Sequence, residues 1–209
     1  MRYRCLWREA APPEQELVRI LSPWIYEANQ PFADWFFGDP HVGAEITAEW
    51  AARPTSESYV GRAVVQFDED TARPVGCLIS MSGADLVRCR SADFAEFCEE
   101  LGPGPEADKI VGEVIGYSRE LFPAVASTDL YVSRVAVDPA QRGRGFGRQL
   151  VTYATGARRA DGFRTCRLDV SADNLGAIAT YRACGWVEGP VSRAEGPGLA
   201  YRMMTLALR

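Results

Sequence analysis

The alternation of hydrophobic and polar positions predicts seven short strands. They are rich in β-branched and aromatic side chains, and turn residues such as glycine, proline and aspartate separate most of them. The predicted strands cover residues 2–9, 59–67, 74–81, 129–137, 164–170, 186–191 and 199–208. The segment 129–137 is apolar on both faces, which is typical of a central strand covered by helices on both sides.

Segments between these strands carry apolar residues at helical spacing. The predicted helices cover residues 12–24, 41–50, 91–101, 106–121, 146–157 and 174–184. Residues 102–105, Gly-Pro-Gly-Pro, separate two of them, and we interpret about 91–122 as a helical insertion. A cluster of aromatic side chains within 25–37 fits either core packing or the wall of a pocket.

The order of these elements predicts the topology. Strand, helix and strand follow one another over 129–170, which predicts a right-handed parallel crossover. The strand pairs within 59–81 and 186–208 predict antiparallel hairpins. We therefore expect an α/β fold with a mixed sheet and helices on both faces. With 209 residues, 47% of them hydrophobic and 24% charged, the chain fits one domain over 1–209.

The segment from Val135 to Leu150 passes from an apolar strand through a glycine-rich turn into a helix. Gly143, Gly145 and Gly147 alternate there with three arginines. A helix N-terminus has unpaired N–H groups and the positive end of the helix dipole, so it attracts anions. Glycine lets a bulky phosphate approach the backbone. In a chain of net charge -5, this local positive charge predicts a phosphate site.

The spacing of the glycines excludes two common classes of phosphate-containing ligand. A dinucleotide-binding G-x-G-x-x-G turn requires glycine where Arg148 stands, and a P-loop requires a Gly-Lys-Ser/Thr ending that this segment lacks. A surface turn with arginines for solubility stays open at this point. An RNA-binding arginine and glycine segment is disfavoured, because the arginines lie beside one helix start in an acidic protein.

Composition excludes several other classes. Six cysteines and one histidine form no C-x-x-C pair or metal-ligand pattern, so we expect reduced thiols and no metal. No apolar run approaches the ~20 residues of a membrane span. The first seven residues lack the apolar core of a signal peptide. We therefore expect a cytoplasmic location with no membrane partner, and the acidic balance predicts no nucleic-acid partner.

Two motifs in order resemble the GNAT acyltransferase superfamily over about residues 130–189. The first is R-x-x-G-x-G at Arg142, Gly145 and Gly147, after a Val-x-Val-x-Pro strand end. The second is the segment 174–186, which is similar to a superfamily helix with Asn, Ala and Tyr followed by Gly-Phe, with tryptophan here in place of phenylalanine. The resemblance implies a GNAT-like fold with a mostly antiparallel sheet of about seven strands and one splayed parallel pair.

The resemblance also implies an activity. It predicts an acetyl-CoA-dependent N-acetyltransferase that transfers an acetyl group directly to a primary amine of a small molecule, peptide or protein in a ternary complex. Tyr181 is implied as the general acid for the departing thiolate. The residues implied to bind acetyl-CoA are Val135, Ala136, Val137, Arg142, Gly143, Arg144, Gly145, Phe146, Gly147, Arg148, Asn174, Ala177 and Tyr181. The oligomeric state is left open, a homodimer included.

The general base departs from the superfamily pattern. Many members offer a glutamate on the strand before the phosphate loop, whereas this strand presents Tyr131, Ser133 and Arg134. We expect Asp129 or Glu113 to remove the amine proton, because an amine of pKa ~10.4 is protonated at neutral pH. The missing glutamate leaves a catalytically silent CoA-binding or regulatory domain as the alternative. The tyrosine of the second motif favours the enzyme.

Overall fold

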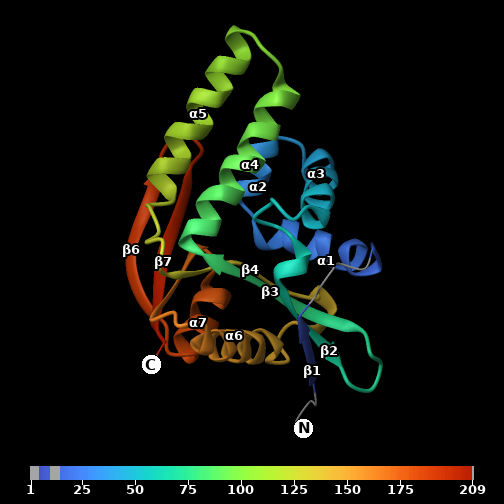
Figure 1. The fold of residues 1–209 in the computed structure, drawn as a ribbon. Coiled ribbons are helices and arrows are strands. Elements are labelled where there is room, and N and C mark those ends of the chain that lie inside the picture. The colour runs from blue at the N-terminus through green and yellow to red at the C-terminus, as the bar shows by residue number, and fades with distance from the viewer. Residues whose placement is uncertain (1–4, 10–14, 209) are drawn as a thin grey trace.

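Seven strands form one sheet in the order β1-β2-β3-β4-β5-β7-β6 (Figure 1). The computed structural model describes residues 5–9 and 15–208. Within them β4 and β5 are the parallel pair, and the other neighbouring strands run antiparallel. The predicted mixed, mostly antiparallel sheet is confirmed. The strands are β1 Cys5–Glu9, β2 Ala63–Asp68, β3 Pro74–Ser82, β4 Leu130–Val137, β5 Thr165–Ser171, β6 Val187–Ala194 and β7 Leu199–Ala207.

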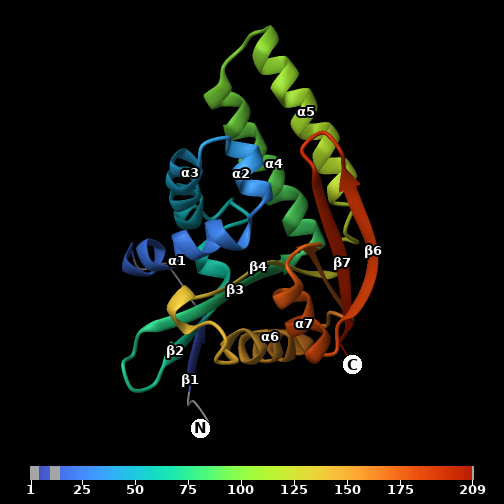
Figure 2. The same ribbon diagram turned by 180° about the vertical axis from the view of Figure 1, so that it is seen from behind.

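Helices cover both faces of the sheet. They are α1 Gln15–Ala28, α2 Phe32–Phe37, α3 Pro40–Ala52, α4 Gly83–Leu101, α5 Pro105–Leu121, α6 Phe146–Ala157 and α7 Leu175–Ala183. Figures 1 and 2 show α6 and α7 on one side of β3 and β4, with α1 to α4 on the other. Within the described residues, no helix is long and apolar enough to cross a membrane.

The central strand divides the core into two parts. Leu130 and Val132 pack with Leu150 of α6 on one face of the sheet. Tyr131 and Ala136 belong to the cluster on the other face, with residues of α1, α3 and α4. Leu130, Tyr131 and Val132 alternate between the faces with the period of two in a strand. A β-bulge then shifts this period at Ser133, where the register with β3 changes between Ile79 and Ser80, so Ala136 lies on the face of Tyr131. Because both of its faces are buried, β4 is held in a fixed position at the centre of the sheet.

β4 and β5 are paired over a short stretch only. Their register joins Leu130 to Cys166 and Tyr131 to Arg167. On its other side β4 remains paired with β3 as far as Val137. The later residues of β4 therefore turn backbone groups toward β5 without bonding to that strand. The predicted splayed parallel pair is confirmed.

Helix α4 begins earlier than the sequence pattern predicts. It starts at Gly83 rather than at Ser91, so the two helices of this region cover 83–101 and 105–121. The cause is a cap at the end of β3, where the Ser82 side chain accepts a hydrogen bond from the N–H of Asp85 at 3.0 Å. A serine cap satisfies an N–H group that the helix itself cannot pair. The strand therefore passes directly into the helix.

Other boundaries differ by smaller amounts. β2 begins at Ala63 rather than at residue 59, because Val60–Arg62 form a 3-10 turn. The predicted start of the first strand, residues 2–4, lies outside the described residues, as does the predicted start of the first helix at 12–14. The later start of β2 leaves the predicted order of the elements unchanged, but α2 is a short helix that the pattern does not predict within 25–37.

Candidate active site

One cavity of about 700 Å³ lies beside α6 and α7. We call it the loop cavity, because residues 142, 143 and 145–148 line it together with residues 135–137 of β4. Of the thirteen residues predicted to bind the cofactor, the structure brings all except Arg144 to this cavity. The guanidinium of Arg144 instead lies over the ring of Phe146, 5.5 Å from its centroid. Residues of three segments, 24–28, 135–148 and 174–183, thus line one space.

The glycine loop has the geometry of an anion cradle. Gly143 and Gly145 have φ angles of +76° and +85°, a left-handed conformation that favours glycine. The first helical hydrogen bond of α6 runs from the N–H of Gln149 to the carbonyl of Gly145 at 3.1 Å. The N–H groups of residues 146–148 precede that bond and point beyond the helix start. A Cβ built on either glycine meets no atom within 4 Å, so the loop has room for a bulky diphosphate.

A second cavity, of about 680 Å³, adjoins the loop cavity where β4 and β5 separate. We call it the aromatic cavity, because it is lined by rings from α2, α3, α4 and β7 and by one ring that directly follows α5: Phe32, Phe36, Phe37, Trp50, Phe94, Tyr201 and Phe122. The rings also pack on one another, as in the edge-on contact of Phe36 and Phe37 with centroids 4.9 Å apart. The aromatic cluster within 25–37 is therefore both packing and pocket wall. Apolar rings of this kind bind an apolar group and exclude water.

The two cavities meet at the opening between β4 and β5. Val135, Asn174, Ala177 and Tyr181 line both of them. Asn174 caps α7, with its side-chain oxygen accepting a hydrogen bond from the N–H of Ala177 at 3.0 Å. This cap holds α7 in place at the junction. A group in one cavity can therefore reach a group in the other.

Tyr181 lies at this junction. Its side chain is 8% exposed, and its ring is tilted against Trp186 with centroids 5.8 Å apart. Burial raises the pKa of Tyr181 above the ordinary value of a tyrosine. The hydroxyl therefore keeps its proton throughout the neutral range. A protonated hydroxyl of this kind is able to donate a proton to a group in either cavity.

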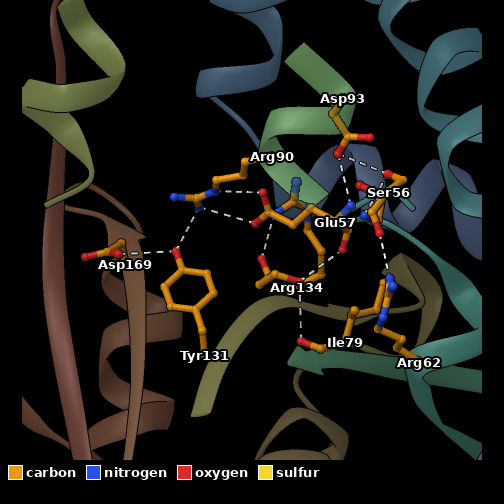
Figure 3. A network of polar contacts seen from close by, with 11 residues as sticks. Ser56, Glu57, Arg62, Ile79, Arg90, Asp93, Tyr131, Arg134 and Asp169 are labelled. Atoms are coloured by element: carbon orange, nitrogen blue, oxygen red, sulfur yellow. Dashed lines mark hydrogen bonds and ion pairs between the residues drawn. The ribbon is translucent and has the colours of Figure 1, made fainter. Parts of the chain in front are cut away.

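A cluster of charges, in which Glu57 and Arg134 are buried and Arg90 is partly exposed, lines the aromatic cavity (Figure 3). The carboxylate of Glu57 accepts hydrogen bonds from Nε of Arg90 at 2.8 Å and from Nη1 of Arg134 at 3.3 Å. Burial alone would raise the pKa of Glu57, but the two guanidinium groups outweigh it and hold the pKa below its ordinary value. Glu57 is thus ionised at neutral pH. The three side chains together carry one net positive charge.

A second carboxylate, Asp169 of β5, faces the same cavity. The hydroxyl of Tyr131 donates to Oδ2 of Asp169 at 3.2 Å and accepts from Nη2 of Arg90 at 3.3 Å (Figure 3). Arg167 lies 3.2 Å from the Asp169 carboxylate. Burial raises the pKa of Asp169 above that of an ordinary aspartate, although Arg167 opposes the shift. A buried carboxylate with a raised pKa inside a cavity is typical of a general base.

The two carboxylates predicted as bases lie elsewhere. Glu113 is on the exposed side of α5, whereas Val114 and Ser118 of that helix line the aromatic cavity. Asp129 directly precedes β4 at the end where it is paired with β5, and its carbonyl accepts from the N–H of Gly83 at 2.9 Å. Neither residue lines either of the two cavities.

Sequence reasoning does not find the charged residues of the aromatic cavity. Glu57 lies 33 residues from Arg90 and 77 from Arg134, so no local spacing connects them. Asp169 does carry a signal. It stands between Leu168 and Val170 in an apolar strand, where a carboxylate must be paired or functional.

Comparison with known proteins agrees with this geometry. The family model described as Acetyltransferase (GNAT) family matches residues 24–186, which is more than half of the chain. The chain therefore belongs to the GNAT acetyltransferase family. The matched segment contains the glycine loop, the splayed strands and Tyr181.

The individual proteins that resemble this chain share little sequence identity with it. A mycothiol acetyltransferase of Cellulomonas flavigena is 35% identical over 99 residues, which cover 47% of this chain and 24% of that protein. The match thus spans about a quarter of the relative's length. Among solved structures, an N-acetyltransferase from Staphylococcus aureus Mu50 has a TM-score of 0.66 at 18% identity, with 96% of this chain and 100% of that chain covered. A phosphinothricin acetyltransferase from Sinorhizobium meliloti in complex with AcCoA has a TM-score of 0.57 at 17% identity, with 97% and 88% covered. At these identities the structures show a shared fold.

Proposed function

We propose that the protein is an acetyl-CoA-dependent N-acetyltransferase that transfers the acetyl group directly to a primary amine in a ternary complex. The observation that carries this proposal is that the loop cavity and the aromatic cavity meet at Tyr181. Two substrates bound on opposite sides of the opening can therefore react without a covalent enzyme intermediate. Holding both in one geometry is a large part of catalysis.

The loop cavity binds the donor in this proposal. The N–H groups of residues 143–148 hold the diphosphate, and Arg142 and Arg148 add positive charge. The free edge of β4 at Val135 and Val137 pairs with the amide groups of the pantetheine arm. Acetyl-CoA supplies the activated thioester carbonyl when bound. Its acyl end is then beside Tyr181.

In this proposal two side chains carry out the proton transfers of the reaction. Asp169 accepts a proton from the acceptor ammonium, directly or through water, in the role predicted for Asp129 or Glu113. Its burial makes it a stronger base than an exposed aspartate. Tyr181 donates its proton to the departing thiolate. The nearby guanidinium of Arg90 favours the neutral, reactive form of the amine, because a like charge lowers an ammonium pKa.

The alternative is a silent domain that binds CoA without turnover. The strand glutamate of many GNAT proteins is replaced here, which supports that alternative. The buried Asp169 in the aromatic cavity and the buried Tyr181, which lines both cavities, support the enzyme instead.

Thiol release from acetyl-CoA across a panel of primary amines tests the proposal. We expect release that depends on the amine, with an N-acetylated product seen by mass spectrometry. Calorimetric binding of CoA together with no release from any amino acid, arylalkylamine, polyamine, aminoglycoside or peptide would establish the silent domain.

A further inference from the structure

We propose that the acceptor is a zwitterionic α-amino acid with a bulky apolar side chain, whose carboxylate binds Arg90 and Arg134 while its amine faces Asp169 and Tyr181. This inference rests on the proposed function and names the substrate class of the same site. It is carried by the arrangement of opposite charges around one hydroxyl group.

That hydroxyl belongs to Tyr131. It contacts a cation, Arg90, at 3.3 Å and an anion, Asp169, at 3.2 Å (Figure 3). The aromatic cavity therefore presents a guanidinium and a carboxylate side by side. An α-amino acid carries an ammonium and a carboxylate on one carbon atom. Each charge of the zwitterion thus meets its opposite in the cavity.

The cations exceed the anions where the carboxylate is to bind. Three carboxylates line the aromatic cavity, namely Glu57, Asp93 and Asp169. Asp93 accepts from Nη2 of Arg53 at 3.1 Å, and Asp169 is paired with Arg167 at 3.2 Å. Glu57 by contrast faces two guanidinium groups. Buried charges are stable when paired, so a ligand anion completes this cluster.

Contacts with neighbouring residues fix the guanidinium groups of Arg90 and Arg134 before any anion binds. Arg90 lies over the rings of Phe122 and Tyr131, each with its centroid 5.3 Å from the guanidinium carbon. Arg134 is 10% exposed and bonds through Nη1 to Glu57 and to the carbonyl of Ser133. Its Nε is buried, and the described residues give it no hydrogen-bond partner. Fixed guanidinium groups bind a carboxylate with little loss of side-chain entropy.

The rest of the aromatic cavity fits an apolar side chain. Rings from α2, α3 and α4 line much of the aromatic cavity, and an apolar side chain can pack against them. A polyamine would place a second cation beside Arg90, where like charges repel. A peptide N-terminus has an amide in place of the carboxylate. Matched acceptors distinguish these cases.

The experiment measures thiol release by the 209-residue protein with acetyl-CoA and matched acceptors. The set is L-phenylalanine, L-leucine, L-methionine and L-tryptophan, each beside its amide, with 2-phenylethylamine, L-alanine and spermidine. We expect kcat/KM for the best amino acid to exceed that for its amide by about 10- to 100-fold, the usual effect of hydrogen bonds to a charged group. L-alanine falls below it by at least about 10-fold, because the apolar wall is left unfilled.

Two variants on α4 test the carboxylate contact. Arg90→Met lowers the ratio of kcat/KM for acid over amide by at least about 10-fold, and Arg90→Lys, which keeps a cation, recovers part of it. Arg88→Met is the matched control, since Arg88 is an exposed arginine on the same helix that pairs with Asp85. It leaves the ratio unchanged. The lysine variant keeps the test valid if the methionine variant fails to fold.

The outcomes separate the two proposals. Equal or better turnover of an amide, 2-phenylethylamine or spermidine overturns the amino-acid acceptor and leaves the acetyltransferase proposal standing. An unchanged acid-to-amide ratio in Arg90→Met overturns the assignment of Arg90. No thiol release from any amine overturns the proposed function itself.

Discussion

Glu27 of α1 and Arg142 of the glycine loop form an ion pair at the edge of the loop cavity, with Oε1 and Nη1 2.6 Å apart. The hydrogen bond from Arg142 lowers the pKa of Glu27, so the carboxylate is ionised at neutral pH. Both side chains are partly exposed, at 39% and 49%. An anion that binds the loop must therefore share this guanidinium with Glu27.

Glu27→Gln should tighten CoA binding. The substitution removes a negative charge beside the diphosphate and frees Arg142. A partly exposed pair is worth about 0.2–1 kcal/mol, so we expect Kd to fall by about 2- to 5-fold. Calorimetry with CoA at low and high salt measures it, and the gain shrinks at high salt because the charges are screened. Glu16→Gln, which removes an exposed partner of Arg19 on the same helix, should leave Kd unchanged. Weaker binding by the Glu27 variant would mean that the pair positions Arg142.

Tyr181→Phe should lower kcat by ~10²-fold or more with little change in CoA affinity. The ring still fills its place against Trp186, and only the proton donor is lost. Steady-state kinetics and CoA calorimetry measure the two effects. Tyr153→Phe removes the hydroxyl of an exposed tyrosine on α6 and serves as the control. An unchanged kcat in Tyr181→Phe would remove this residue from the acid role.

Asp169→Asn should lower kcat/KM by ~10²-fold or more and abolish the acidic limb of its pH profile. Burial raises the pKa of Asp169, so in the parent protein activity falls as the pH drops through a value above that of an ordinary aspartate. Below that pH the carboxyl holds its own proton and cannot accept another. Asp129→Asn and Glu113→Gln remove the carboxylates predicted from the sequence. If kcat/KM fell further in Asp129→Asn or Glu113→Gln than in Asp169→Asn, the residue changed in that variant, and not Asp169, would be the general base.

Local patterns predict the part of this molecule that depends on neighbouring residues. The glycine loop and the capped helix after Asn174 are each contained in one stretch of sequence, so motif and spacing locate them. The start of α4 carries a comparable signal in Ser82 and Asp85, three residues apart. Glu57 differs, because its partners come from α4 and β4 and only the folded sheet brings them together. The glycine loop is therefore predictable from the sequence, whereas the cluster of Glu57, Arg90 and Arg134 is not.

Glu57→Gln should destabilise the fold. The change leaves Arg90 and Arg134 in the aromatic cavity without their counter-charge, and an unpaired buried charge is strongly unfavourable. Because Arg90 is 35% exposed, we expect a loss of about 2–4 kcal/mol in the free energy of unfolding, below the upper end for fully buried pairs. For a chain of 209 residues this lowers Tm by about 5–15 °C.

The pH dependence of that loss has a definite sign. The pKa of Glu57 is lowered by folding, so its contribution is complete above the ordinary glutamate pKa of about 4.3 and is lost as the pH falls through the lower folded value. Urea unfolding of the parent and the variant should differ most at pH 7 and converge on acidification. Glu16→Gln, at an exposed pair on α1, should unfold like the parent at every pH. A Glu57 variant as stable as the parent at pH 7 would show that solvent reaches the two guanidinium groups and that the cluster does not need an anion.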